Sequence, residues 1–258
     1  MKPRRLILHA GPHKTGTSSI QAVLRDHVFS AFHYPKTGQW PDGSHHNLVF
    51  SLVPELRRGD AEVLDAADLL EQLQRELADV QQQAFLISSE FLSTGCAARL
   101  VEWLVGHGLA DPDGIRALLV ERDLLSRAAS LYNQAVKDPY VGETRSPDAW
   151  LSEEATSLRF EPIQAELRSA VTAVDVLSYE PAENLVQRVL MAAGAHQEEL
   201  PDKMPWTNIS MSEPVLKALL EVNRTVADPE ERIQRRNQLF HLLRPAFTPS
   251  SPRLFSDS

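Results

Sequence analysis

The sequence has a single cysteine, Cys96, among its 258 residues, and no long hydrophobic run. One cysteine cannot form a disulfide within the chain, so the composition gives no sign of an oxidising compartment. No apolar stretch approaches the roughly 20 residues that a helix needs to cross a bilayer. The sequence therefore argues against a disulfide-held scaffold and predicts no membrane span.

Positive charge is also scarce in this chain. The 26 lysines and arginines are outnumbered by 35 aspartates and glutamates, which gives a net charge of −9 and a pI near 5.5. Proteins that bind nucleic acids or membrane surfaces through charge need the opposite balance. We therefore expect no nucleic-acid partner, and a long polyanionic substrate is disfavoured.

The remaining composition is typical of a soluble globular protein, with 43% hydrophobic and 24% charged residues. Short apolar runs that predict strands alternate with stretches of helical periodicity, and the four strands are expected at 6–8, 84–87, 114–120 and 174–180. This alternation predicts one three-layer α/β/α domain over residues 1–258, P-loop-like, with a mainly parallel sheet. Its C-terminal part, from about residue 212, is expected to be helical.

The stretch 6–24, LILHAGPHKTGTSSIQAVL, predicts a strand, a glycine-bearing loop and a helix in succession. The backbone N–H groups of such a loop, with the N-terminus of the helix, bind anions. Gly11 and Gly16 have the spacing of a nucleotide P-loop, but a threonine and a serine follow Gly16 where that motif has Lys and Ser/Thr. The lysine lies inside the loop instead, at Lys14, so it would reach a different part of the anion.

A second phosphate site is indicated by the segment ERDLLSRAASLYNQ. Arg122 follows the strand expected at 114–120, and Ser130 lies eight residues later on the next predicted helix. A guanidinium matches phosphate bidentately, and a hydroxyl roughly two turns into the helix can donate to the same group.

Two candidate general bases lie elsewhere in the chain. Glu90 comes directly after the strand expected at 84–87, and ligands collect at the carboxyl ends of parallel strands. His45 and His46 precede an apolar segment, and a neutral imidazole is a natural base near pH 7. Simpler interpretations stay open: Glu90 could favour the N-terminus of a serine-capped helix, and the histidines could be a solvated pair. Two histidines without further ligands at matched spacing predict no metal site.

The string HKTGTSS resembles the 5′-phosphosulfate loop of the P-loop sulfotransferase superfamily, and Arg122 with Ser130 resembles its 3′-phosphate motif. These enzymes use 3′-phosphoadenosine 5′-phosphosulfate (PAPS) and release 3′-phosphoadenosine 5′-phosphate (PAP). The resemblance spans about residues 5 to 215. It implies a bacterial enzyme that moves the sulfuryl group of PAPS to a hydroxyl or amine of a carbohydrate or small-molecule acceptor, without a metal.

The resemblance also implies roles for individual residues. Lys14 would stabilise the charge on the departing oxygen, and Glu90 or His46 would take the acceptor proton, with Glu90 slightly preferred because it follows a strand end. The residues implied to hold PAPS or PAP are His13, Lys14, Thr15, Gly16, Thr17, Ser18, Arg122, Ser130, Asn208 and Ser210.

Other features of the resemblance concern location and acceptor. Golgi members of the superfamily carry a membrane anchor, and its absence here implies a cytoplasmic enzyme. The loops 30–46, 138–150 and 195–211 are expected to shape the acceptor pocket. The C-terminal G-x-x-G-x-x-K lid of the hormone-type enzymes is missing from the sequence. A P-loop kinase or NTPase, and a non-catalytic relative that binds PAP, are the alternatives.

Overall fold

The computed structural model describes residues 2–57, 63–179, 184–202 and 211–243. Within it the chain falls into two compact units. The first comprises Met1–Arg122 and Phe160–Thr207, and the second comprises Asp123–Arg159 and Asn208–Ser258.

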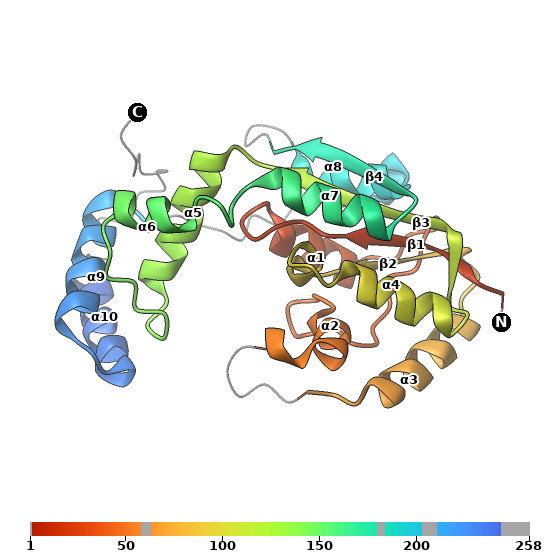
Figure 1. Ribbon diagram of the computed structural model, residues 1–258, viewed down its shortest axis with the longest axis horizontal. Helices are drawn as coiled ribbons and strands as arrows, with labels where there is room; N and C mark the ends of the chain where they lie inside the picture. Colours follow the sequence, from red (N-terminus) through yellow and green to blue (C-terminus); the bar gives the residue numbers. More distant parts are fainter. Residues whose placement is uncertain (1, 58–62, 180–183, 203–210, 244–258) are drawn as a thin grey trace. The chain divides into compact units, whose positions relative to one another are not determined.

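A parallel sheet of four strands forms the centre of the first unit, in the order β2-β1-β3-β4 (Figure 1). The strands are β1 Arg4–His9, β2 Ala84–Ser88, β3 Ala110–Glu121 and β4 Ala173–Ser178. Each contains or overlaps one of the predicted apolar runs. His33 forms an isolated parallel bridge with Phe85, so a further extended segment lies beside β2.

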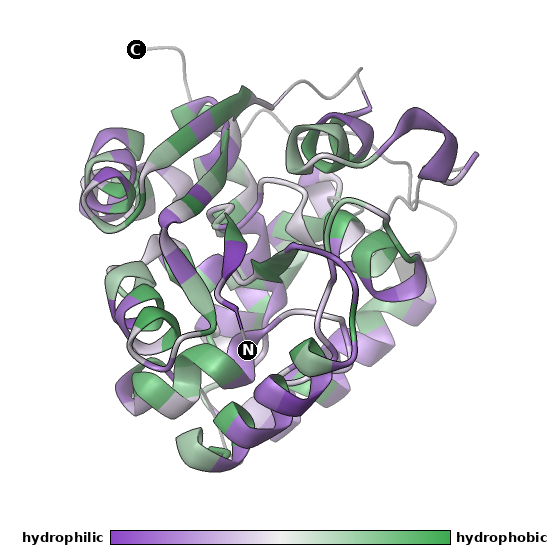
Figure 2. Ribbon diagram, turned by 90° about the vertical axis from the view of Figure 1, so that its right-hand side faces the viewer, coloured by the Kyte–Doolittle hydropathy of each residue, from purple (hydrophilic) through white to green (hydrophobic). Residues whose placement is uncertain are grey.

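Helices cover both faces of this sheet. Side chains alternate along a strand, so Ile7 faces one helical layer while Leu6 and Leu8 face the other. The layer on Ile7 consists of α1 Thr17–Asp26 and α8 Leu185–Ala193. The opposite layer consists of α2 His46–Leu52, α3 Ala66–Ala78, α4 Ala97–Gly106 and α7 Phe160–Ala170. Figure 2 shows apolar and polar residues alternating along these helices, as expected for elements with one buried face. The predicted three-layer α/β/α class with a parallel sheet is confirmed.

The second unit is helical where it is described. It contains α5 Leu124–Lys137, α6 Pro147–Glu154, α9 Glu213–Thr225 and α10 Pro229–Leu243. Tyr132, Trp150 and Leu219 are buried in its apolar core. From residue 213 the described C-terminal part consists of α9, a short connection and α10. The loop predicted at 138–150 is wrong from residue 147, because Ser146 accepts a hydrogen bond from the Ala149 N–H and starts α6.

Three short 3-10 turns complete the described elements, at Pro54–Leu56, Glu90–Ser93 and Gln197–Glu199. None of the helices in the described ranges has both the length and the apolar character that crossing a bilayer requires.

Candidate anion-binding and acid–base site

The order of the strands marks one edge of the sheet for ligand binding. β1 and β3 are neighbours, and the chain leaves them in opposite directions, through α1 to β2 and later through α7 to β4. In open parallel sheets, ligands bind outside the carboxyl ends of the strands at such a switch point. The loop of residues 10–16 follows β1 and Arg122 follows β3, so the two predicted phosphate motifs begin at this point.

The loop of residues 10–16 has an unusual backbone conformation at its lysine. Lys14 has φ 73°, and among the described residues it is the one non-glycine with a positive φ. Gly16 follows with φ 83° and forms the N-cap of α1 without a side-chain cap. The left-handed conformation costs an L-residue about 1–2 kcal/mol. Such strain persists where the surroundings impose it, and it is found at ligand clamps.

Close packing inside the loop fixes its path. The Thr15 side chain is fully buried, and its hydroxyl donates to the Pro12 carbonyl oxygen at 2.7 Å. A Cβ on Gly11 would come within 2.8 Å of Thr17 Cγ2, so only glycine fits there. The Thr15 hydroxyl therefore stabilises the loop. The predicted contact of Thr15 with an anion would have to come from its backbone N–H.

Arg122 connects the end of β3 to this loop. Its Nη1 donates to the Lys14 carbonyl oxygen at 2.6 Å, and its guanidinium carbon lies 4.5 Å from the centre of the Tyr179 ring. Two motifs separated by 108 positions in the sequence are thus in direct contact. Ser130 lies on α5 in the second unit and is half-buried, so its joint role with Arg122 stays a prediction. Asn208 and Ser210 lie outside the described residues.

The other predicted loop residues lie around the start of α1. The His13 ring is half-buried and packs edge-on against Phe91, with 5.6 Å between ring centres. Thr17 is the first residue of α1 and is buried, whereas Ser18, the second, is half-buried. The two hydroxyl residues therefore differ in access, and Ser18 is the more accessible to a ligand.

Glu90 is the centre of a buried polar cluster next to the loop. Its Oε1 accepts a hydrogen bond from the Thr17 hydroxyl at 2.5 Å. Its Oε2 accepts from Gln21 Nε2 at 3.2 Å and lies 3.6 Å from His46 Nε2. The structure therefore brings both predicted bases together, beside the first turn of α1. Ser89 does cap the turn that begins at Glu90, as the simpler interpretation expected, yet the carboxylate faces Thr17 and Gln21.

The electrostatics of the cluster favour an ionised Glu90 and a neutral His46. Burial raises the pKa of the Glu90 carboxyl, but the Thr17 hydrogen bond and the nearby His46 and His13 together bring it below its ordinary value. Burial lowers the pKa of His46 from its ordinary value, and the Glu90 carboxylate offsets this only in part. Near pH 7 both side chains are consequently in the form that can accept a proton.

The two adjacent histidines have different surroundings. His45 is fully buried; its Nε2 donates to the Pro35 carbonyl at 2.7 Å and its Nδ1 accepts from the Ser88 N–H at 3.1 Å. His46 places its Nδ1 2.8 Å from the Ser89 hydroxyl, leaving its Nε2 directed at Glu90. The alternative of a solvated pair is wrong for both. His45 has a structural role, and His46 belongs to the cluster.

Sequence reasoning missed two members of this cluster, His9 and Gln21. His9 ends β1 fully buried, with its Nδ1 2.8 Å from the Ser88 hydroxyl. Gln21 Nε2 donates to the same hydroxyl at 3.2 Å. In the part of the chain that the structure describes, neither His9 Nε2 nor Gln21 Oε1 has a hydrogen-bond partner. The position of Gln21, four residues after Thr17 on the same helix face, is the signal that could have identified it.

Comparison with known proteins gives little guidance. No family model matches the sequence, and no curated protein matches it. Among solved structures, a chain from a study titled "Molecular and structural characterization of the PezAT chromosomal toxin-antitoxin system of the human pathogen Streptococcus pneumoniae" is 14% identical, with 93% of this chain and 88% of that chain covered. The TM-score is 0.36. A similarity at this level carries no functional argument.

The buried histidines predict a loss of stability in mild acid. Burial lowers the pKa of His9 and of His45 to about 4. The unfolded chain takes up protons at these positions below about pH 6.5, whereas the folded protein does not until about pH 4. Their contribution is therefore complete well above pH 6.5 and is lost as the pH falls, by about 1.5 kcal/mol per histidine between pH 6.5 and 5.

Urea titrations at pH 7.5, 6.5, 5.5 and 5.0 measure this loss as a falling free energy of unfolding. In His45→Gln the free energy of unfolding should fall about half as steeply between pH 6.5 and 5 as in the unmodified chain. The glutamine amide can still donate to the Pro35 carbonyl, but it does not titrate. An unfolding free energy that is equal at pH 7.5 and 5.0 contradicts the prediction.

Proposed function

We propose that the chain is a PAPS-dependent sulfotransferase that acts on a hydroxyl or amine of a carbohydrate or small molecule. The hydrogen bond from Arg122 to the Lys14 carbonyl supports this most directly, because it joins the two motifs that such an enzyme needs. A guanidinium beside a strained lysine loop suits a ligand that carries a phosphosulfate and a separate 3′-phosphate. The position of both motifs at the switch point of the sheet agrees with this assignment.

The proposed reaction is an in-line displacement at sulfur. A bond forms between the acceptor oxygen or nitrogen and sulfur, while the bond from sulfur to the bridging oxygen breaks and PAP departs with the electron pair. The Lys14 ammonium and the N–H groups at the start of α1 stabilise the charge that develops on that oxygen. The acceptor proton passes to the Glu90 carboxylate, which is ionised and lies beside Thr17 at the loop.

A P-loop kinase or NTPase is less well supported. In the nucleotide P-loop the residue after the second glycine is a lysine that reaches the terminal phosphates. Thr17 has that place here, and its side chain is 4% exposed and donates to Glu90 at 2.5 Å. No cation from this position reaches a phosphate. Magnesium-dependent turnover of ATP would restore the kinase alternative.

A non-catalytic PAP-binding protein is also less favoured. A carboxylate and an imidazole, each less than a tenth exposed and 3.6 Å apart, are costly to bury. Perturbed pairs of this kind are concentrated at catalytic sites, whereas the binding of PAP alone does not require a proton acceptor. The Glu90–His46 pair therefore supports an enzyme.

Ligand-dependent thermal stability tests the assignment. PAP should raise the melting temperature more than AMP or Mg-ATP, since a ligand at about 100 times its Kd stabilises the native state by about 2.7 kcal/mol. In Arg122→Gln the advantage of PAP over AMP should disappear. It should remain in Arg99→Gln, which removes an exposed arginine on α4. Stronger stabilisation by Mg-ATP than by PAP would count against the proposal.

A further inference from the structure

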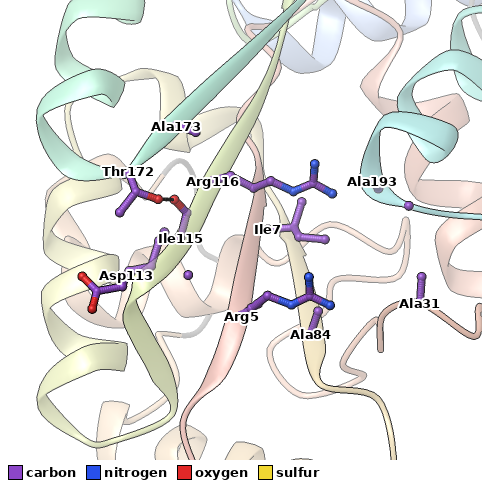
Figure 3. A pocket seen from close by; sticks show the side chains of 12 residues that line it. Arg5, Ile7, Ala31, Ala84, Asp113, Ile115, Arg116, Thr172, Ala173 and Ala193 are labelled. Atoms are coloured by element: carbon purple, nitrogen blue, oxygen red, sulfur yellow. Dashed lines mark hydrogen bonds between the residues drawn. The ribbon is translucent and has the colours of Figure 1, made fainter.

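A concave site opens at the other end of the sheet, where the strands begin. It is a cavity of about 400 Å³ with two arginines, Arg5 of β1 and Arg116 of β3, in its lining (Figure 3). Small residues form much of the remaining wall, namely Ala31, Ala84, Ala193 and Gly194. The cavity exists because α8 ends at Ala193, which leaves the first residues of the strands uncovered on this face.

The pairing of the strands places both arginines on one face of the sheet. Ile7 is the partner of Arg116 across β1 and β3, and Arg5 is two positions before Ile7 on the same face. Figure 3 shows the two guanidinium groups extending to the same side, with Ile7 between them. The carboxylate of Asp113 is directed away from both.

The preceding residue, Arg4, shows what a structural arginine looks like in this part of the fold. Its guanidinium donates to the carbonyl oxygens of Leu77, Val80 and Gln82. The side chain of Arg5, by contrast, makes no hydrogen bond or ion pair with any residue in the described ranges, and it is exposed; the backbone N–H of Arg5 donates to Gln83 within the sheet. The Arg116 guanidinium lies 3.5 Å from Asp175, a long and half-exposed contact of the kind that contributes little to stability. Neither Arg5 nor Arg116 is accounted for by the packing of the fold.

We propose that this cavity binds a tetrahedral oxyanion, phosphate or sulfate, carried on a small molecule. Two guanidinium groups on neighbouring strands offer two planar forks to one anion, and such forks match phosphate or sulfate oxygens bidentately. The volume is within the range of small-molecule sites, and the alanine and glycine wall leaves room for the body of the ligand. The C-terminus of α8 opposes an anion with about half a charge, and Asp175 offsets part of the charge on Arg116; the full charge of Arg5 still leaves the balance at the cavity positive.

This site is separate from the one at the carboxyl ends of the strands. Arg5 precedes His9 by four residues on β1, which corresponds to about 13 Å along an extended strand. The proposal does not rest on sulfuryl transfer, and a ligand here would bind without occupying the loop at Lys14. The ligand of this cavity would therefore have a regulatory or auxiliary role.

An NMR titration tests the site in the full chain carrying Lys14→Ala, which weakens the other anion site. Inorganic phosphate and inorganic sulfate should each produce saturable shifts at the amides of Arg5, Arg116 and Gly194, and acetate should bind at least fivefold more weakly. The double variant Arg5→Gln with Arg116→Gln should raise the Kd for phosphate at least tenfold. Arg99→Gln, which removes an exposed positive charge elsewhere, should change it less than twofold.

A second variant keeps both arginines and reduces the volume of the cavity. Ala31→Leu should raise the Kd for phosphate at least fivefold, because the larger side chain enters the cavity. The absence of saturable shifts, an unchanged Kd in the double arginine variant, or equal binding of acetate and phosphate would each overturn the proposal. A preference between phosphate and sulfate identifies which of the two the site is built for.

Discussion

Lys14→Ala is expected to slow the proposed sulfuryl transfer from PAPS by about 100- to 1,000-fold, the usual effect of removing one group that stabilises a departing oxygen. The lysine is half-buried in a loop whose path is fixed by Thr15, Gly11 and Arg122. No other part of the loop supplies a full positive charge at that point. Release of PAP in the presence of a panel of sugar, phenol and amine acceptors measures the rate.

Two further variants separate this chemical effect from damage to the fold. Lys217→Ala removes an exposed lysine on α9, outside the loops expected to shape the acceptor pocket, and should leave the rate within twofold of the unmodified chain. Lys14→Gly should be as inactive as Lys14→Ala but more stable to urea by about 1 kcal/mol, because glycine adopts the positive φ of residue 14 without strain. If Lys14→Ala keeps its rate, or if the glycine variant shows no gain in stability, the role given to this residue is wrong.

Glu90→Gln is expected to lower the same rate by about 100- to 10,000-fold, the range for loss of a general base. The amide preserves the shape of the side chain and can still accept a hydrogen bond from Thr17, so the cluster keeps its packing. In the unmodified chain the rate should fall on the acid side, as Glu90 becomes protonated below its ordinary pKa. That decrease should be absent from the residual activity of Glu90→Gln.

His46→Gln gives the comparison that identifies the base. Without the imidazole, the burial that raises the pKa of Glu90 is less strongly opposed, so the acid-side decrease should move to higher pH while the rate falls only modestly. Glu102→Gln, at an exposed position on α4, should leave both rate and pH profile unchanged. If His46→Gln instead abolishes the pH dependence and Glu90→Gln merely shifts it, the base is His46.

The sheet could be predicted from the sequence because β1, β2 and the second half of β3 are short apolar runs buried between helices, whereas β4 is half-exposed and was indicated by its apolar residues alone. Leu6 to Leu8 and the run ending at Val120 have no other plausible place in an α/β fold. Helix α6 was missed although Ser146 and Pro147 are a typical helix start, since the proline-rich composition of the segment favoured a loop.

The contact between Glu90 and His46 could not be read from the sequence. It depends on the path of residues 30–45, where the Pro35 carbonyl holds His45 and the Trp40 ring packs against His46 with 5.1 Å between ring centres. Such loop geometry has no periodic pattern. The role of Thr15 was hidden for a similar reason, because a hydroxyl in a glycine loop can face either a ligand or the chain's own backbone.

The hydrogen bond from Arg122 to the Lys14 carbonyl has an evolutionary consequence. One guanidinium supports the backbone of the first loop and is also the group proposed to select the nucleotide. A substitution that alters nucleotide preference at this position would release the loop at the same time. Under the proposed function, descendants of this chain would change their acceptor through the outer loops far more freely than their donor, because the donor specificity and the shape of the loop would be inherited together.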